Sequence, residues 1–446
     1  MDHLLRLKHD DESSAGLRPV APLDKTLATL PVAAYGARWG HRSDEAIANM
    51  SRMSMVVLMQ EDGECWTRCC PHVTSSQGQC GVFHNGSAQP GCDAACDQHG
   101  TQLEVFRRMK AAARAAGRRS PHCILYMNTD YLWPYDAVSA AGDAVRIVDV
   151  HGRAHVETCD PGLFPSFLFD YSKQAAREAW LSIVARALNS SADGVYADCY
   201  INDRIICRPP GSNNCTAFRK AHQGAPDSQH NVVSRATAEG WMPGKEHTMR
   251  AAAEMVAARG GSFYAKNAPL GAPPPWGGNT NWIWLTAAHY YQEGSNAGKP
   301  MTTVRGCKAP GDVPGCKIME PGFLIAQVKK VLQHYSYTVV GTDCTLPTGY
   351  MGPHGKYNHS RGLPNSTFVS FCGETGIALF LLALPKEGGA YLLCEGWDEK
   401  FGRRLGRPVA DAVKDATTGE WSRSFEHGTV ARWRNNSGSV KWAPDE

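Results

Sequence analysis

Short apolar runs rich in β-branched and aromatic residues recur along the chain, each about as long as a buried strand. Runs of this length, bounded by glycine, proline or polar residues, predict strands that are covered on both faces. Eight ranges fit the description: 31–37, 54–60, 122–128, 194–199, 261–267, 287–292, 336–342 and 389–394. The pattern therefore predicts eight continuously apolar strands.

Helical periodicity fills most of the intervals between these runs. Apolar residues recur at helical spacing before the fourth, fifth and seventh strands: Trp180, Ile183, Val184 and Ala187; Met249, Ala252, Ala253 and Val256; Leu324, Val328, Val331 and Leu332. The interval 279–288, after the fifth strand, lacks a clear period. Alternating strands and helices predict an α/β fold, and eight such units fit a closed (β/α)8 TIM barrel. A doubly wound open sheet is the alternative, but no G-x-G-x-x-G follows the first strand.

The domain organisation follows from this pattern. Residues 1–29 are expected to be a disordered N-terminal extension, 30–400 the barrel with a Cys-rich insert at 62–100, and 401–446 a small C-terminal β-sheet appendage. Alternation around "HGR" also predicts a hairpin within 145–157.

Charge and hydropathy exclude some partners. The chain of 446 residues carries a net charge of +3 and is 43% hydrophobic, so nothing in it calls for nucleic acid or an anionic membrane. No apolar run reaches the ~18 residues that a membrane span needs. The longest apolar run, "TGIALFLLALP", stops at Pro385 and is expected to be a buried helix. We expect a monomer.

Sixteen cysteines indicate disulfides. Six crowd one irregular stretch without a C-x2-C spacing: Cys65, Cys69, Cys70, Cys80, Cys92 and Cys96. We expect these six to pair mostly among themselves, and Cys307 to pair with Cys316; a zinc site that includes His72 is the alternative. Seven N-x-S/T sequons also favour a secreted or secretory-pathway protein, at Asn49, Asn85, Asn189, Asn214, Asn358, Asn365 and Asn435. The first sixteen residues lack the apolar h-region of a signal peptide, so either a preceding segment is missing or the protein is cytosolic with reduced cysteines. We expect the former.

Candidate site residues follow the predicted strands, because active sites of such barrels lie at the C-terminal strand ends. Acids, amides and aromatic residues dominate there: Trp39; Asn128, Asp130 and Trp133; Asp198; Lys266 and Asn267; Glu293; Asp343; Glu395 and Trp397. No Gly-rich phosphate loop, G-x-S-x-G or H-E-x-x-H accompanies them. A mouth rich in carboxylates and lined by aromatic rings suits glycoside hydrolysis, where two carboxylates act on the bond and flat rings stack on sugars.

Residues 169–200 carry a pattern that resembles one enzyme superfamily. Asp170 precedes a helix that contains Trp180, and Asp193 with Gly194 precedes a short strand that ends in Asp198. This arrangement resembles the fourth βα unit of TIM-barrel glycoside hydrolases, the relatives of α-galactosidases and endo-α-1,4-polygalactosaminidases. The tail "SRSFEHGTVARW" looks like the closing β-sheet of such enzymes. The resemblance implies that Asp198 is the nucleophile and that the acid/base stands at the end of strand six, where Glu293 is expected, with no cofactor.

Other interpretations stay open. Asp198 could pair with Arg204 in a purely structural role, Asp170 could cap the helix, and Asp193 is expected to be a turn residue. The protein as a whole could be a non-catalytic carbohydrate-binding protein, or an extracellular structural protein on the same scaffold. Two carboxylates that share a glycosidic bond lie about 5 to 9.5 Å apart, so the separation of Asp198 and Glu293 distinguishes an enzyme from the other two classes.

Overall fold

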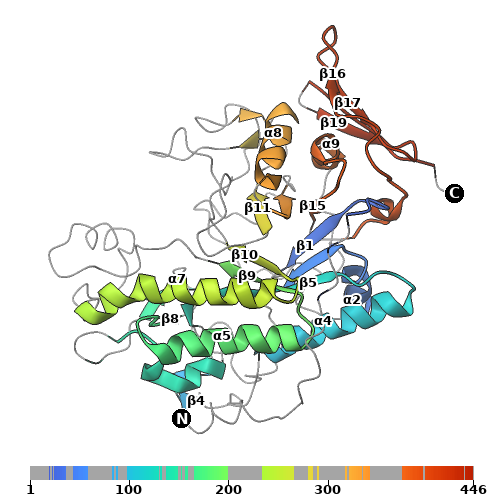
Figure 1. Cartoon of the computed structure of the whole chain (residues 1–446). Coiled ribbons are helices and arrows are strands. Elements are labelled where there is room, and N and C mark those ends of the chain that lie inside the picture. Colours follow the sequence, from blue (N-terminus) through green and yellow to red (C-terminus); the bar gives the residue numbers. More distant parts are fainter. Residues whose placement is uncertain are drawn as a thin grey trace.

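The chain folds around a closed barrel of parallel strands (Figure 1). In the computed structural model the described residues are 20, 23, 25–36, 44–58, 83–84, 87–88, 98–129, 131–132, 137–148, 152, 156–158, 165–198, 234–265, 280–284, 289–290, 317–318, 321–333, 335–341, 374–394, 397–435 and 437–444. The barrel strands are β1 (Val32–Gly36), β2 (Met55–Leu58), β5 (His122–Asn128), β9 (Gly194–Asp198), β10 (Ser262–Ala265), β11 (Thr280–Trp284), β14 (Tyr337–Gly341) and β15 (Ala390–Leu393). They follow one another around the barrel in chain order, and β1 pairs with both β2 and β15. The predicted α/β fold with a barrel-like parallel sheet is confirmed.

The sixth strand differs from the prediction. β11 pairs in parallel with β14 from Thr280↔Tyr337 to Trp284↔Gly341, so it takes the sixth place. The predicted run 287–292 instead contains β12 (His289–Tyr290), which pairs antiparallel with β13 (Lys317–Ile318) outside the barrel. The local prediction of extended backbone holds for His289 and Tyr290, but the prediction of their sheet was wrong. Which strand they join depends on a partner far along the chain, which the local pattern does not reveal.

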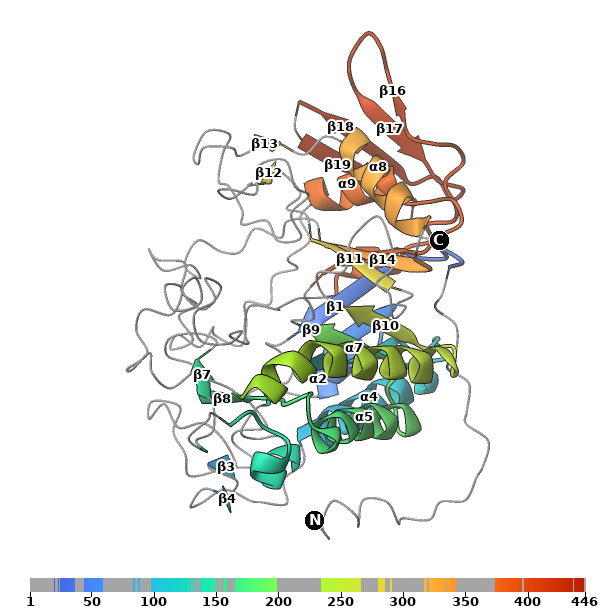
Figure 2. The same cartoon turned by 60° about the vertical axis from the view of Figure 1, so that its left-hand side comes forward.

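Helices cover the outside of the barrel. Those described in the connections are α2 (Asp44–Met50), α4 (Gln98–Ala115), α5 (Gln174–Asn189), α7 (Arg235–Ala257), α8 (Pro321–Leu332) and α9 (Glu374–Ala383). Figure 2 shows α4, α5 and α7 on one side of the barrel strands and α8 with α9 on the other. The faces predicted from periodicity are buried, as Trp180, Met249 and Leu324 illustrate. Gly260, with φ of 71°, adopts the left-handed conformation that ends the connection after α7. No helix in the described part of the chain has both the length and the apolar character needed to cross a membrane.

Tyrosines fill the inside of the barrel. Tyr126 stacks on Tyr196 with ring centroids 5.4 Å apart, and Tyr196 meets Tyr264 at 4.3 Å. Tyr337 and Tyr391 belong to the same buried cluster. In the barrel strands whose side chains are described, alternate residues face outward and pack under the helices, in line with the pleat of a strand. The barrel is therefore a packed core rather than a pore.

The segment before β1 closes one end of this core. Leu23 belongs to the interior tyrosine cluster, and Lys25 Nζ donates to Ser336 O at 3.1 Å, just before β14. The Val20 amide donates to Arg259 O, close to the start of β10. These contacts all lie at the N-terminal strand ends. The expectation of disorder throughout 1–29 is therefore wrong for the part that the structure describes, because Leu23 and Leu27 bury apolar side chains there.

A small sheet is inserted between β5 and α5. Its order is β6 (Tyr131–Leu132), β8 (Pro165–Leu168) and β7 (Val156–Thr158), and a 3-10 helix, η2 (Ala137–Ala144), precedes β7. Most of the predicted hairpin at 145–157 lies outside the described residues; at its two ends, Arg146 bridges Phe169 and β7 pairs with β8. In the Cys-rich insert the structure describes β3 (Phe83–His84) and β4 (Ser87–Ala88), which pair with each other. The six cysteines of the insert, Cys307 and Cys316 lie outside the described residues.

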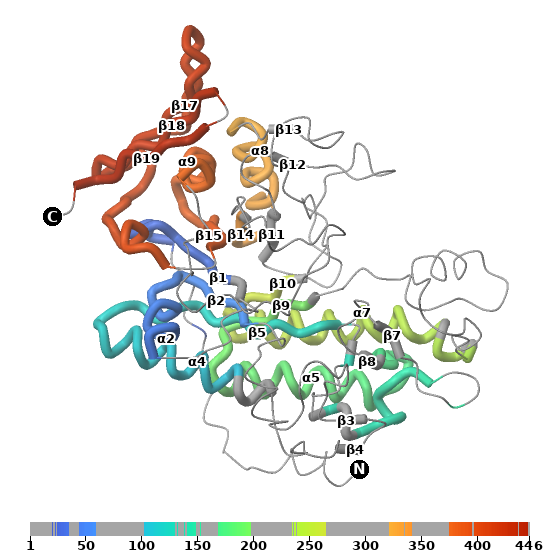
Figure 3. Tube along the Cα trace, turned by 180° about the vertical axis from the view of Figure 1, so that it is seen from behind, coloured from blue at the N-terminus to red at the C-terminus, as the bar shows by residue number. Residues whose placement is uncertain are grey.

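The chain ends in a four-stranded antiparallel sheet. It consists of β16 (Val413–Lys414), β17 (Trp421–Ser424), β18 (Val430–Arg434) and β19 (Ser437–Lys441). Figure 3 shows it beside α9, and Trp433 and Val440 are buried in the same core as that helix. Gly438 permits the contact, because a Cβ there would lie 2.6 Å from the Cβ of Ala378. The sheet is therefore packed onto the barrel's helical layer.

Candidate active site

Asn128 and Asp198 end two neighbouring barrel strands at the same level. The parallel ladder between β5 and β9 runs from Ile124↔Gly194 to Asn128↔Asp198, so the two residues are its last register partners. Both stand at the C-terminal strand ends, where barrels of this kind build their active sites. Asn128 is buried, and the described part of Asp198 is its main chain.

Aromatic side chains from α5 and from the segment before it hold the main chain at the end of β5. Trp180 Nε1 donates to the carbonyl oxygen of Asn128 at 3.2 Å. Tyr171 Oη donates to the carbonyl oxygen of Thr129 at 2.6 Å. Both donors are fully buried. Two consecutive carbonyls at the mouth of the barrel are thus fixed by one side chain of α5 and one of the segment that leads into it.

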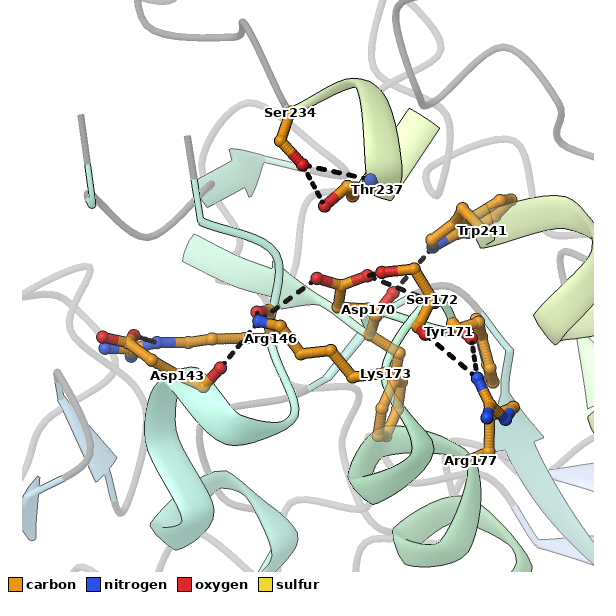
Figure 4. Close-up of polar contacts among 11 residues, drawn as sticks. Asp143, Arg146, Asp170, Tyr171, Ser172, Lys173, Arg177, Ser234, Thr237 and Trp241 are labelled. Atoms are coloured by element: carbon orange, nitrogen blue, oxygen red, sulfur yellow. Dashed lines mark hydrogen bonds and ion pairs between the residues drawn. The ribbon is translucent and has the colours of Figure 1, made fainter. Parts of the chain in front are cut away.

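An ion pair between a buried carboxylate and a partly exposed lysine stabilises this segment (Figure 4). The Asp170 carboxylate is nearly fully buried, and it accepts hydrogen bonds from the amide (3.2 Å) and the hydroxyl (2.5 Å) of Ser172. Lys173 Nζ lies 3.2 Å from the second carboxylate oxygen and also donates to the carbonyls of Asp143 and Arg146, at 2.8 and 2.9 Å. Asp170 is not the helix cap, since Lys173 occupies the N-cap position of α5. Its carboxylate is committed to local structure rather than to a ligand.

Helix α7 packs onto the same segment at very short range. Trp241 Nε1 donates to Phe169 O at 2.7 Å, and its ring meets Tyr171 edge-on at 5.8 Å. A Cβ on Gly244 would lie 1.9 Å from Tyr171 O. The side chain of Ser234 caps α7 by accepting from the Thr237 amide at 3.1 Å. The segment 169–171 is thereby held between α7 and the end of β5.

Asp193 lies at the opposite end of the barrel from Asp198. Its carboxylate accepts from Lys110 Nζ at 2.7 Å and from the amide of Cys123 at 2.8 Å. It therefore joins the start of β5 to the start of β9, and the prediction of a turn residue without a catalytic role agrees with these contacts.

Another buried polar group lies at that same end. His122 Nε2 and Ser262 Oγ are 2.7 Å apart, and Ser262 Oγ donates to Tyr337 Oη at 3.3 Å. Burial lowers the pKa of His122 to about 4, against a smaller opposing effect of Asp193, while Lys110 and Arg119 lower it further. His122 is therefore neutral at physiological pH and part of the barrel floor.

Trp397 lies on the outer wall of the barrel and not at its mouth. The Arg52 guanidinium carbon is 4.8 Å from the centroid of its ring, and Phe401 meets it edge-on at 5.7 Å. Arg52 lies just before β2, so this contact places the Trp397 ring near the N-terminal ends of the strands. After β15 the chain turns back through the 3-10 helix η4 (Glu399–Gly402), where Phe401 O accepts from the Leu30 amide. The expectation that Trp397 stacks on a sugar is therefore wrong.

The remaining expected site residues lie outside the described residues: Trp39, Asp130, Trp133, Lys266, Asn267, Glu293, Asp343 and Glu395. Glu293 does not directly follow strand six as expected, because that strand ends at Trp284. Glu293 still belongs to the connection that follows it, between β11 and α8. Among the described residues no group of three or more His, Cys, Asp or Glu side chains could hold a metal ion.

The hydrogen bonds of two buried aromatic residues escaped the sequence interpretation. Tyr171 and Trp241 follow no strand end, and a buried aromatic residue is ordinarily a packing residue. Their hydrogen bonds to distant carbonyls have no signature in the local sequence.

Comparisons with known proteins concern the fold. No protein-family model matches the chain, and no curated protein matches it in sequence. Solved structures that it is similar to include a GH36 α-galactosidase from Geobacillus stearothermophilus, with 12% identity, a TM-score of 0.38 and coverage of 91% of this chain and 47% of that chain. An α-L-fucosidase from Paenibacillus thiaminolyticus has 11% identity and a TM-score of 0.35, over 84% of this chain and 47% of that one. The glycoside hydrolase domain of PelA from Pseudomonas aeruginosa has 9% identity and a TM-score of 0.29, with coverage of 70% of this chain and 83% of that chain. The chain spans less than half the length of the first two. All three are glycoside hydrolases.

Proposed function

We propose that the protein is a glycoside hydrolase that cleaves an O-glycosidic bond in an oligo- or polysaccharide, with Asp198 as nucleophile or electrostatic partner. The observation that carries the proposal is the position of Asp198, the last residue of β9 at the C-terminal end of a closed parallel barrel, in register with Asn128. Residues at that end of a barrel strand are the ones that such enzymes use for catalysis.

The packing beneath this position limits how a substrate can approach. Residues two apart on a strand share a face, so position 198 follows Gly194 and Tyr196 on the interior side of β9. Tyr196 is fully buried among Tyr126 and Tyr264, and Leu23 closes the far end. A substrate would therefore reach Asp198 only from the C-terminal mouth, over a floor of low polarity.

The proposed general acid comes from the connection between β11 and α8. This connection contains three carboxylic acids, Glu293, Asp312 and Glu320, of which Glu293 comes first after the strand. Glu293 would stand about 5 to 5.5 Å from Asp198 in a retaining enzyme, or about 6.5 to 9.5 Å in an inverting one. Its carboxyl must stay protonated near neutral pH, which burial or the nearby Asp198 charge would favour.

The remaining expected residues would bind the substrate. Asn128 is the one whose main chain is fixed beside Asp198, and its amide suits a hydrogen bond to a sugar hydroxyl. We assign substrate contacts to Asp130, Lys266, Asn267, Asp343 and Glu395, and stacking on sugar rings to Trp39 and Trp133.

An extracellular location goes with this function. Cys394, directly after β15, is disulfide-bonded. Disulfides form and persist in oxidising compartments, so this bond supports a secreted protein.

The decisive experiment is an activity screen on α- and β-linked aryl glycosides and oligosaccharides, with Asp198→Asn and a matched control. Asp198→Asn removes the anion but keeps the size of the side chain, so kcat should fall by roughly 10³-fold or more while glycan binding persists. Asp398 caps η4 on the outer wall, so Asp398→Asn is the matched control and should leave kcat unchanged. Glycan binding without any turnover by the wild-type protein would indicate a carbohydrate-binding protein instead and would overturn the proposal.

The role of Glu293 as general acid is tested with substrates whose leaving groups differ. Glu293→Gln should slow natural oligosaccharides far more than aryl glycosides with good leaving groups, because only the former need a proton on the departing oxygen. Asp312→Asn serves as the control from the same connection. Equal losses on both kinds of substrate would remove Glu293 from this role.

A further inference from the structure

Two residues of the pattern at 170–198 hold the same neighbouring strand at its two ends. Asp193 accepts from the Cys123 amide at the start of β5, at 2.8 Å. Trp180 Nε1 donates to Asn128 O at the end of β5, at 3.2 Å. The strand so held is the one whose last residue is in register with Asp198.

Trp180 donates to Asn128 O on the side of β5 that faces β2. The His122 amide donates to Ser54 O, toward β2. The main-chain N–H and C=O groups of every second residue on a strand point to the same side, so those of Asn128 also point toward β2. β2 ends at Leu58, in register with Leu125, three residues short of Asn128. Within the described residues the Asn128 carbonyl thus lies beyond the ladder with β2, and Trp180 donates a hydrogen bond to it.

Tyr171 extends the same support by one residue. Its hydroxyl donates to Thr129 O, at the point where the chain leaves the barrel. Tyr171 is itself fixed, because Arg177 Nη1 donates to its carbonyl at 2.8 Å and α7 packs against it at Gly244. The carbonyls of Asn128 and Thr129 therefore have two independent, fully buried donors.

We infer that Trp180 and Tyr171 are positioning residues of the proposed glycosidase site: by fixing the main chain of Asn128 and Thr129 they keep Asn128 level with Asp198. The inference rests on the proposed function and adds two residues that do not touch the substrate. Asn128 would orient the bound sugar for attack at Asp198, and a misplacement of the order of 1 Å can lower turnover by about 10²-fold, so the loss of either hydrogen bond should affect kcat more than substrate binding.

The test compares three conservative variants that each remove one buried donor. Trp180→Phe and Tyr171→Phe each lose a hydrogen bond to the end of β5. Trp241→Phe is the matched control, because Trp241 is equally buried and donates to Phe169 O, away from the β5 strand end. For each variant, kcat and KM are measured on a glycan that the wild type cleaves, together with the thermal midpoint.

We expect kcat to fall about 10-fold or more in Trp180→Phe and Tyr171→Phe, with KM within about twofold of the wild type. Trp241→Phe should lower the thermal midpoint to a similar extent but keep kcat. If Trp180→Phe does not fold, Tyr171→Phe, which removes a single hydroxyl, decides the matter. An active wild type whose Tyr171→Phe and Trp241→Phe variants have equal kcat overturns this inference alone. A wild type that cleaves no glycan overturns the proposed function and this inference with it.

Discussion

Gly244 of α7 faces the carbonyl oxygen of Tyr171 so closely that a Cβ on it would lie 1.9 Å from that oxygen. One turn earlier, a Cβ on Gly240 would lie 3.0 Å from the Cβ of Ser172. The two glycines, four residues apart on one face of the helix, let α7 lie against the main chain that supports the barrel mouth.

Gly244→Ala should therefore destabilise the protein more than Gly240→Ala. The carbonyl of Tyr171 is main chain and cannot move aside, so α7 must shift, at a cost of about 1–3 kcal/mol or more. At Gly240 the neighbour is a half-buried side chain, and the better helix propensity of alanine offsets part of the strain. Thermal midpoints of the two variants and the wild type check this. Equal midpoints for Gly244→Ala and the wild type would contradict the close contact.

Acid should destabilise the barrel through His122. The unfolded residue titrates near pH 6.5 and the folded one near pH 4, so between these values the unfolded chain binds a proton that the folded chain does not. Stability therefore falls as the pH is lowered through this window, by up to about 3 kcal/mol, and this contribution levels off below about pH 4. Thermal midpoints from pH 7 to 4 should fall less steeply in His122→Gln, which cannot titrate but can still bond Ser262. Parallel curves for the two proteins would argue against a buried, neutral His122.

Arg423 should hold the C-terminal sheet to the barrel. Its guanidinium is buried and donates to Leu382 O at 2.9 Å, Leu384 O at 2.5 Å and Ala410 O at 3.0 Å, so it satisfies carbonyls at the end of α9. Arg423→Met leaves these acceptors without a donor, which should cost about 1–3 kcal/mol and expose the sheet to limited proteolysis. Arg432→Met, an exposed residue on the next strand, is the control and should digest like the wild type. Identical digestion of the two variants would show that the sheet is held by its apolar face alone.

Cys394 should resist alkylation until a reductant is added. The protein is denatured without reductant and treated with iodoacetamide, and modified peptides are identified by mass spectrometry. Cys123, a buried free thiol whose pKa is raised by burial, becomes accessible on unfolding and should be modified. Cys394 should remain unmodified because it is in a disulfide, and reduction should lower stability by about 2–4 kcal/mol. Modification of both cysteines in the absence of reductant would show that Cys394 is reduced.

Seven of the eight barrel strands follow from local sequence, because a parallel barrel buries both faces of each strand and leaves a continuous apolar run. β11 is the exception. Its sequence, "TNWIW", has polar residues at its start, and the run at 287–292 matches strand preferences better. Pairing with β14 decided which of the two entered the barrel, and pairing is a property of the whole fold.

Residues of the site could be predicted from the sequence where a polar side chain stands at the end of a predicted strand. Asp198 closes a strand that the sequence delimits, and its place at the mouth could be inferred from that alone. Trp397 follows a strand end just as closely, yet the chain reverses along the barrel wall within four residues, where Arg52 covers its ring. Trp180 and Tyr171 act on main-chain carbonyls more than forty residues away, and no residue type at the acceptor marks such a bond.

The pairing of β1 with β15 has a consequence for how the chain is made. Ala33 and Leu393 are register partners although 360 positions separate them in the sequence. At about 5–20 residues per second, a ribosome needs roughly 20–70 s to synthesise the chain between them. During that time β1 presents an apolar strand with one edge unpaired, and such edges invite association with other chains. Production of this protein should therefore depend on chaperone supply and on slow translation at low temperature, because the barrel cannot close until nearly nine-tenths of the chain exists.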